Sequence, residues 1–124
     1  MKPILVAVGV ANSRRRLVEI LVDAGYKVVE ADSGELALTV AHTTPPKLIL
    51  VSIVMPDITG LEFAAQLQQS LADRTPPMIV MGTIPPIGLN DEPLVSLVDG
   101  YLNLDVSPVD LLTTVQSQLV MAGQ

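Results

Sequence analysis

The residues best placed to do chemistry are Ser52, which lies in the most apolar run of the chain, and Asp57, which follows it. Residues 48–54 are otherwise aliphatic and rich in β-branched side chains, a pattern that predicts a strand buried on both faces. Pro56 ends the run, and Gly60 completes a Pro-Asp-x-x-Gly turn. Ser52 is therefore expected near the carboxyl end of a central strand, where open α/β sheets carry their chemistry.

A serine at that edge could act as a nucleophile or accept a phosphoryl group. A nucleophilic serine needs an adjacent base, and we expect neither His42 nor an acidic residue beside Ser52. His42 has no Cys or His companion in the sequence and is interpreted as a surface residue. Asp57 is the only acid nearby and is interpreted as a turn residue. The residues alone therefore favour a space-filling Ser52 over an enzyme.

Composition limits the remaining classes of protein. The 124 residues fit one domain, 1–124, and contain no cysteine, which agrees with a reducing cytoplasm. The apolar run at residues 4–10 is too short to span a bilayer and is interpreted as a first strand. With 49% hydrophobic and 16% charged residues, the chain has more apolar surface than a core of this size buries. We expect part of that surface to be exposed or covered by a partner.

The net charge of −6 is unevenly distributed, because Arg74 is the last basic residue. The charged residues beyond it are all acidic: Asp91, Glu92, Asp99, Asp105 and Asp110. This distribution repels phosphate backbones, so nucleic acid is not an expected partner. The run Arg14-Arg15-Arg16 opens a predicted helix and opposes its dipole. Either these arginines have partners elsewhere in the fold, or Arg15 forms a local ion pair with Glu19.

Alternating strands and helices predict a doubly wound, five-stranded parallel sheet of order 2-1-3-4-5, with helices on both faces. Besides the central run, the expected strands are 4–10, 26–31, 78–81 and 100–104. The first expected helix begins at a cap on Asn12 or Ser13 and ends at Gly25, and the second begins at a cap on Ser33 and runs through Ala41. The third spans 61–72, the fourth spans about 92–97, and the last begins at a cap on Ser107.

The chain resembles the receiver domain of two-component response regulators over essentially its whole length. The residues that carry the resemblance are Leu48 to Gly60, Gly25-Tyr26-x-Val28, Ala31-x-Ser33-Gly34-x-x-Ala37-Leu38, Pro77-x-Ile79 and Tyr101-Leu102. The resemblance implies a flavodoxin-like fold. It also implies phosphoryl transfer from a histidine kinase to an aspartate, assisted by Mg²⁺ on an acidic pair, a hydroxyl residue and a lysine followed by proline.

Position by position, the resemblance implies that this machinery is missing. The acidic pair falls on Val8 and Gly9, and the phosphate acceptor falls on Ser52. The remaining positions are Gly82 with Thr83 for the hydroxyl, Leu104 and Asp105 for the lysine and proline, and Tyr101 for the rotating aromatic switch. Without carboxylates or lysine, nothing holds Mg²⁺ or offsets phosphoryl charge. A degenerate pseudo-receiver without metal or cofactor is the expected result.

Three functions remain open. The first is an interaction module that signals by being bound, with a histidine kinase, another signalling protein or a second copy as partner. The second is a small-ligand sensor whose polar pocket at the strand ends would be lined by Asn12, Ser52, Thr83, Asn103 and Asp105. The third is a residual phosphoacceptor through Ser52. Signatures for flavin, cobalamin and dinucleotide binding are absent from the sequence.

The expected interaction face covers the fourth predicted helix (92–97), the strand 100–104 and the last helix. It includes an apolar loop, acidic side chains and the switch tyrosine: Ile84, Pro85, Pro86, Ile87, Asp91, Glu92 and Tyr101. Apolar contacts there would supply affinity, and the acids would steer a basic partner. We expect a cytoplasmic protein that contacts neither membrane nor nucleic acid.

Overall fold

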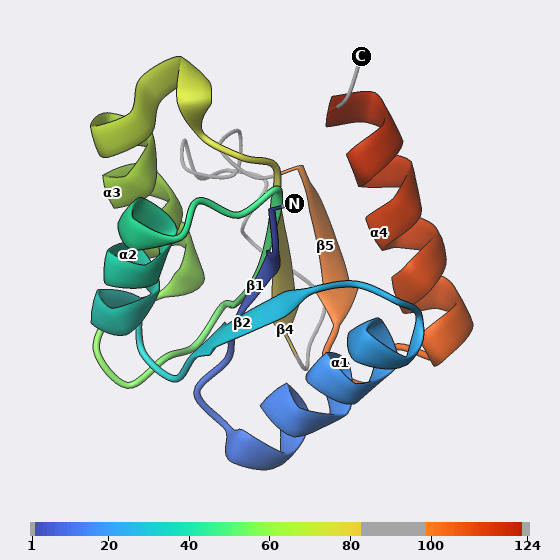
Figure 1. The fold of residues 1–124 in the computed structure, drawn as a ribbon. Coiled ribbons are helices and arrows are strands. Elements are labelled where there is room, and N and C mark those ends of the chain that lie inside the picture. Colours follow the sequence, from blue (N-terminus) through green and yellow to red (C-terminus); the bar gives the residue numbers. More distant parts are fainter. Residues whose placement is uncertain (1, 83–98, 123–124) are drawn as a thin grey trace.

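The computed structural model describes residues 2–82 and 99–122 (Figure 1). The elements in chain order are β1 (Ile4–Ala7), α1 (Ala11–Asp23), β2 (Val28–Ala31), α2 (Gly34–Thr43), β3 (Leu48–Ser52), α3 (Gly60–Leu71), a 3₁₀ turn (Ala72–Arg74), β4 (Met78–Gly82), β5 (Gly100–Asn103) and α4 (Pro108–Ala122). The predicted helix 92–97, the loop 84–90, and Thr83, Asp91 and Glu92 lie outside the described residues.

The five strands form one parallel sheet of order β2-β1-β3-β4-β5, which confirms the predicted architecture. Ala7 pairs with Val51, and Ser52 pairs with Met81. In a parallel sheet, aligned strands bring their carboxyl ends to one edge. The last residues of β1, β3, β4 and β5 therefore meet at the same edge, hereafter the carboxyl edge.

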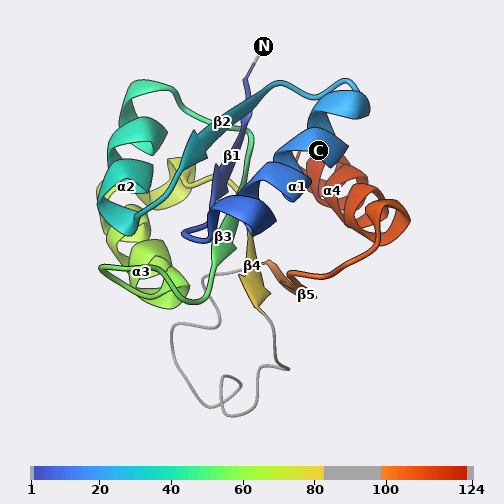
Figure 2. The same ribbon diagram turned by 90° about the horizontal axis from the view of Figure 1, so that it is seen from below.

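Helices cover both faces of the sheet, with α2 and α3 on one side and α1 and α4 on the other (Figures 1 and 2). Alternate strand residues feed two cores, as the pleat requires. Leu5, Ile49 and Val80 pack with Phe63 and Leu67 beneath α2 and α3. The opposite core holds Ile4, Val6, Leu48, Leu50, Ile79, Met81, Leu17, Leu21, Leu111 and Val115. Because β1, β3 and β4 are buried on both faces, their continuous apolar runs are explained.

Helix starts follow the sequence signals in part. The Ser33 and Ser107 hydroxyls accept hydrogen bonds from the Leu36 and Asp110 N–H groups at 3.1 Å, which confirms both predicted caps. The prediction of Asn12 or Ser13 as a cap is wrong. Helix α1 begins at Ala11 behind Val10, which has no side-chain cap, because the Arg14 N–H already bonds the Val10 carbonyl and draws those residues into the first turn.

Strand and helix ends also differ from the predictions. Strands β1 and β2 are shorter than expected, since pairing stops at Ala7 and starts at Val28. Ala24 continues the apolar spacing of Leu17 and Leu21 but is exposed, because α1 ends just before it. Gly25 follows with a φ of +95°, the left-handed conformation that ends helices and that glycine adopts without strain.

Candidate functional site

Ser52 is the last residue of β3 and is 4% exposed. Its hydroxyl donates to the Val54 carbonyl oxygen at 2.8 Å and accepts from the Val54 N–H at 3.3 Å. The hydroxyl is thus closed into a local turn. His42 lies in the last turn of α2, which begins at the carboxyl edge and runs back toward the opposite edge, and its Nδ1 bonds the Leu38 carbonyl at 2.7 Å. It is not the base that a nucleophilic Ser52 would require.

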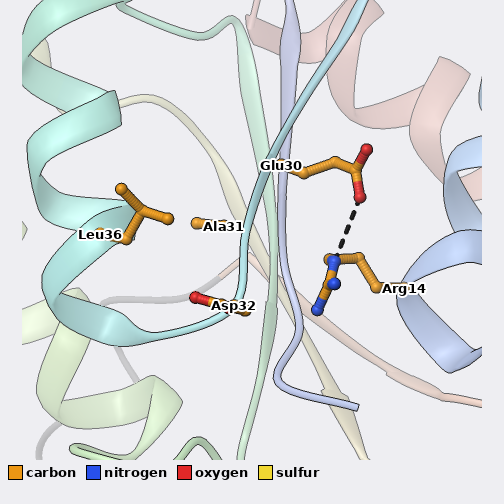
Figure 3. A pocket seen from close by; sticks show the side chains of 5 residues that line it. All are labelled: Arg14, Glu30, Ala31, Asp32 and Leu36. Atoms are coloured by element: carbon orange, nitrogen blue, oxygen red, sulfur yellow. Dashed lines mark hydrogen bonds and ion pairs between the residues drawn. The ribbon is translucent and has the colours of Figure 1, made fainter. Parts of the chain in front are cut away.

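At the positions expected for the acidic pair, the main-chain carbonyls of Val8 and Gly9 accept hydrogen bonds from a guanidinium. Arg14 Nη1 donates to the Val8 carbonyl oxygen at 2.8 Å and reaches that of Gly9 at 3.5 Å. Its Nε donates to Glu30 Oε1 at 3.1 Å, joining α1 to β2 (Figure 3). The Val8 side chain is fully buried. Within residues 2–82 and 99–122, no three Asp, Glu or His side chains gather as candidate metal ligands.

Gly82 ends β4 and is covered by the Tyr101 side chain from β5. A Cβ placed on Gly82 would lie 2.1 Å from Tyr101 Oη and 3.1 Å from its Cζ. The tyrosine therefore occupies the volume that a hydroxyl side chain at position 82 would fill. Burial raises the pKa of the Tyr101 phenol above its ordinary value. The residue implied to be a rotating switch lies inward over a position that has no hydroxyl to offer.

The loop after β5 is tied to the sheet and to α1. The Leu104 N–H donates to the Gly82 carbonyl at 2.6 Å. Arg16 donates to the Leu104 carbonyl at 3.3 Å and to the Val106 carbonyl at 2.5 Å. A guanidinium from α1 thus lies at the loop where the resemblance implies a lysine, but its donors are directed at backbone oxygens of the chain itself.

Asp57 links its turn to the start of α2, a contact that the sequence did not predict. Its carboxylate accepts from the Gly34 and Glu35 N–H groups, both at 2.8 Å, and from the Ile58 N–H at 2.9 Å. These backbone hydrogen bonds lower the pKa of Asp57 below its usual value of 3.8. Asp57 is therefore a turn residue, as interpreted, and it also caps α2 from a loop 23 residues away.

A pocket of about 290 Å³ opens near the end of β2, which neighbours β1 on the side opposite to β3 and Ser52. Its lining residues are Arg14, Glu30, Ala31, Asp32 and Leu36 (Figure 3). Of the residues predicted to line a polar pocket, Asn12, Ser52, Asn103 and Asp105 do not belong to it, and Thr83 lies outside the described residues. Its volume is at the lower limit for small-molecule sites, and its Arg14 and Glu30 are already paired with each other.

Two features were not predicted from the sequence: a capping box, which has a known sequence signature, and the contacts of two arginines, which do not. Thr59 and Glu62 form a reciprocal capping box at the start of α3, and the spacing Thr-x-x-Glu is its known signature. The contacts of Arg14 and Arg16 had only the indirect signal that arginines disfavour a helix start. The ion pair considered between Arg15 and Glu19 is not seen; the described residues pair Arg14 with Glu30.

The comparison with known proteins agrees with the fold. A sequence model of the family described as "Response regulator receiver domain" matches residues 4–116. The response regulator receiver protein CpdR of Brucella abortus is 42% identical over 64 residues, which cover 52% of this chain and 53% of that protein. The circadian input-output histidine kinase CikA of Synechococcus elongatus is 32% identical over 98 residues, covering 79% of this chain and 13% of that protein.

Solved structures give the same fold. A receiver domain protein (CheY-like) from Methanospirillum hungatei superposes with a TM-score of 0.89 at 22% identity, covering 99% of this chain and 97% of that one. The chemotaxis protein CheY4 of Vibrio cholerae gives 0.86 at 26% identity, with coverage of 94% and 98%.

The chain therefore belongs to the receiver-domain family of two-component response regulators. It spans about half of CpdR and a smaller part of CikA. In the part of the chain that the structure describes, we find no helix with the length and hydropathy of a membrane span.

Proposed function

We propose that this chain is a receiver domain that is not phosphorylated on aspartate and that signals as a protein–protein interaction module. The observation that carries the proposal is the state of Ser52 at the acceptor position. Its hydroxyl is buried and engaged with Val54, and no carboxylate from Val8 or Gly9 is available to hold a metal beside it. Phosphoryl transfer depends on such charge neutralisation. Transfer to this edge lacks both the acceptor and the assistance.

The inward Tyr101 supports the same proposal. The resemblance implies that, in the family, the conformation of this aromatic side chain is coupled to the phosphate and to a hydroxyl after the fourth strand. Here Gly82 supplies no hydroxyl and the tyrosine fills its place. The domain would therefore keep one conformation for its partner instead of switching between two.

Intact-protein mass spectrometry after incubation with acetyl phosphate and Mg²⁺ tests this proposal. We expect no added phosphate on the unaltered chain, and Ser52→Ala serves as the control. An added phosphate that disappears in Ser52→Ala would refute the proposal and establish the residual phosphoacceptor. A small molecule retained in the native spectrum would instead favour the small-ligand sensor.

The proposed partner is a histidine kinase, another signalling protein or a second copy of the chain. It would bind the face formed by β5, α4 and the segment that contains Ile84, Pro85, Pro86, Ile87, Asp91 and Glu92. On the described part of this face, Val109 and Met121 of α4 are 72% and 66% exposed, and Asp110 adds negative charge. Apolar area and acidic charge suit a partner with a basic, apolar surface.

A symmetric pair has limited basic surface to offer, because Arg14 and Arg16 are occupied within the chain. Arg15 is the exposed member of the run.

The test of this face is Ile84→Ser with Ile87→Ser and, separately, Asp91→Lys with Glu92→Lys, followed by light scattering and binding to purified candidate kinases. If both folded variants associate and bind as the parent does, this face is not the interface. Cell fractionation would test the cytoplasmic location that accompanies this role.

A further inference from the structure

We propose that the side of α4 that faces away from the sheet pairs with the same side of α4 in a second copy of the chain, with the two helices antiparallel. This side is hereafter the outer stripe and consists of Val109, Thr113, Gln116 and Val120. The inference rests on the proposed function and selects a second copy from the partners named there.

The outer stripe lies opposite the buried side of α4. Leu111 and Val115 are fully buried in the core between α4 and the sheet. At 3.6 residues per turn, positions 109, 113, 116 and 120 fall within about 60° of one another on the far side of the helix. All four residues are exposed, and the valines that end the stripe are 72% and 58% exposed.

Helix α4 lies at the periphery of the molecule, with the sheet and α1 on its inner side (Figures 1 and 2). The outer side of a surface helix is ordinarily rich in polar and charged residues. The outer stripe has instead an exposed valine at each end and no charge. Apolar side chains gathered in this way indicate a surface that a partner covers.

Charge does not oppose pairing with a second copy. Asp110 is the one charged residue among the 15 of α4. It follows Val109 by one position, about 100° around the helix, and so lies on the flank of the outer stripe. A second copy therefore needs no basic residue to cover the stripe. This matters because Arg14 and Arg16 are engaged within the chain.

The order of side chains in the outer stripe is suited to a two-fold pair. Read from either end, the stripe is a valine, two polar residues and a valine. An antiparallel pair that places Val109 opposite the partner's Val120 also places Thr113 opposite the partner's Gln116. The hydroxyl and the amide can then hydrogen-bond each other. A two-fold interface requires this self-complementarity, because each of its contacts occurs twice.

The same alignment separates the two Asp110 carboxylates. Asp110 lies level with the partner's Leu119, nine positions from the partner's Asp110, which is about 13 Å along the helix axis. That separation exceeds the Debye length of about 8 Å at physiological ionic strength. A helix of 15 residues is about 22 Å long, so an interface made by α4 alone is small for a specific complex. The dimer should therefore dissociate on dilution.

Disulfide trapping tests the alignment, because the chain contains no cysteine of its own. Val109→Cys and Val120→Cys are made as separate chains and oxidised alone and as a mixture. We expect the mixed disulfide to form at least about tenfold faster than the disulfide of either chain with itself. In the proposed pair, like positions lie about 16 Å apart, whereas a disulfide needs Cα atoms within about 7 Å. Equal rates, or no disulfide in any sample, would overturn the inference.

Sedimentation velocity over a range of concentrations measures the association, with circular dichroism to establish that each variant folds. We expect Val120→Lys to raise the dimer dissociation constant at least about tenfold, because it buries an unpaired ammonium. Val22→Lys changes a valine on α1 that is 52% exposed and should leave the constant within about twofold of the parent. Equal weakening by the two variants would overturn the inference. A monomer at every concentration would also overturn it and would leave the outer stripe to a different protein.

A chain with both Val109→Glu and Val120→Lys should associate again, because the alignment places each glutamate opposite a lysine of the partner. Association no stronger than that of Val120→Lys would overturn the antiparallel alignment. A phosphate on Ser52 would refute the proposed function without changing these results, so the two can fail separately.

Discussion

Replacing Gly82 with alanine tests whether Tyr101 can lie inward only because position 82 has no side chain. The added Cβ would lie 2.1 Å from Tyr101 Oη, 3.1 Å from its Cζ and 3.2 Å from Ile53 Cγ2. Gly82 does not have a positive φ, so the strain is steric and not conformational. The backbone is held by pairing with Asn103 and by the Leu104 hydrogen bond, so the side chain on the edge strand β5 must move.

The expected destabilisation follows from two routes. If the ring stays, overpacking costs about 1–3 kcal/mol. If the ring rotates outward and exposes roughly 100 Å² of the area that a tyrosine normally buries, the loss is about 2.5 kcal/mol at ~25 cal/mol per Å². Both routes predict a free energy of unfolding lower by about 1–3 kcal/mol, and roughly 3–6 °C in Tm for each kcal/mol in a domain of this size.

Urea denaturation measures the stability, and ultraviolet titration of the phenol reports the ring. Both are made in a Tyr26→Phe background, because the chain has two tyrosines. Rotation outward should return the raised pKa of Tyr101 toward 10.0. Gly100→Ala is the matched control, since among the described residues the nearest atom to its Cβ would be Ile79 Cγ1 at 3.9 Å.

Equal stability of the Gly82→Ala and Gly100→Ala variants, with an unchanged Tyr101 pKa, would refute the reasoning. A double-mutant cycle gives an independent check. Tyr101→Leu removes the hydroxyl and ring that clash, so Gly82→Ala should destabilise the leucine variant much less than the parent. Additive effects would show that Tyr101 is not the obstacle.

Three other predictions follow from the same edge of the sheet. Asp57→Asn should lower stability at neutral pH. Because the pKa of Asp57 is lowered from 3.8, the carboxylate stabilises the fold fully above that value, and this stabilisation is lost as the pH falls through the lowered pKa. The urea midpoints of parent and variant should therefore converge in acid. A constant difference down to strongly acidic pH would contradict this. Arg16→Gln should lower the free energy of unfolding by about 1 kcal/mol, because it releases the loop after β5. Arg15→Gln should change it by less than about 0.5 kcal/mol, and urea denaturation measures both. Millimolar Mg²⁺ should leave Tm unchanged and beryllofluoride should cause no NMR shifts from Ser52 to Tyr101; a saturable rise in Tm, or such shifts, would show a working phosphorylation site.

The sheet and its order were predictable because buried parallel strands leave continuous apolar runs in the sequence. The helices were predictable from apolar residues at helical spacing, and Leu17, Leu21, Leu67 and Val115 of these stripes are buried. Helix and strand ends were less predictable, since they depend on which backbone group finds a partner first. Ala24 shows this, because α1 ends before it and leaves it exposed.

The candidate site was predictable in its positions but not in its contacts. Strand alignment alone brings Val8, Ser52 and Gly82 to one edge, as expected. Arg14 reaches Glu30 across 16 residues and Arg16 reaches Leu104 across 88. Such contacts depend on the reach of long side chains across packed elements, and periodicity carries no information about them.

The motif that marks the family most clearly in this chain, Pro56-Asp57-x-x-Gly60, persists for structural reasons that do not involve phosphate. A Cβ on Gly60 would lie 2.5 Å from the Ser52 carbonyl oxygen, so any side chain there would push α3 away from β3. Asp57 caps α2, and Pro56 lies close to Gly9, where an added Cβ would be 3.1 Å from the proline Cδ. The resemblance instead assigns the metal, the hydroxyl and the lysine to positions at the ends of β1 and β4 and after β5. Because the proline, the aspartate and the glycine each have a structural role, this motif is evidence of the receiver fold and is not by itself evidence of phosphorylation.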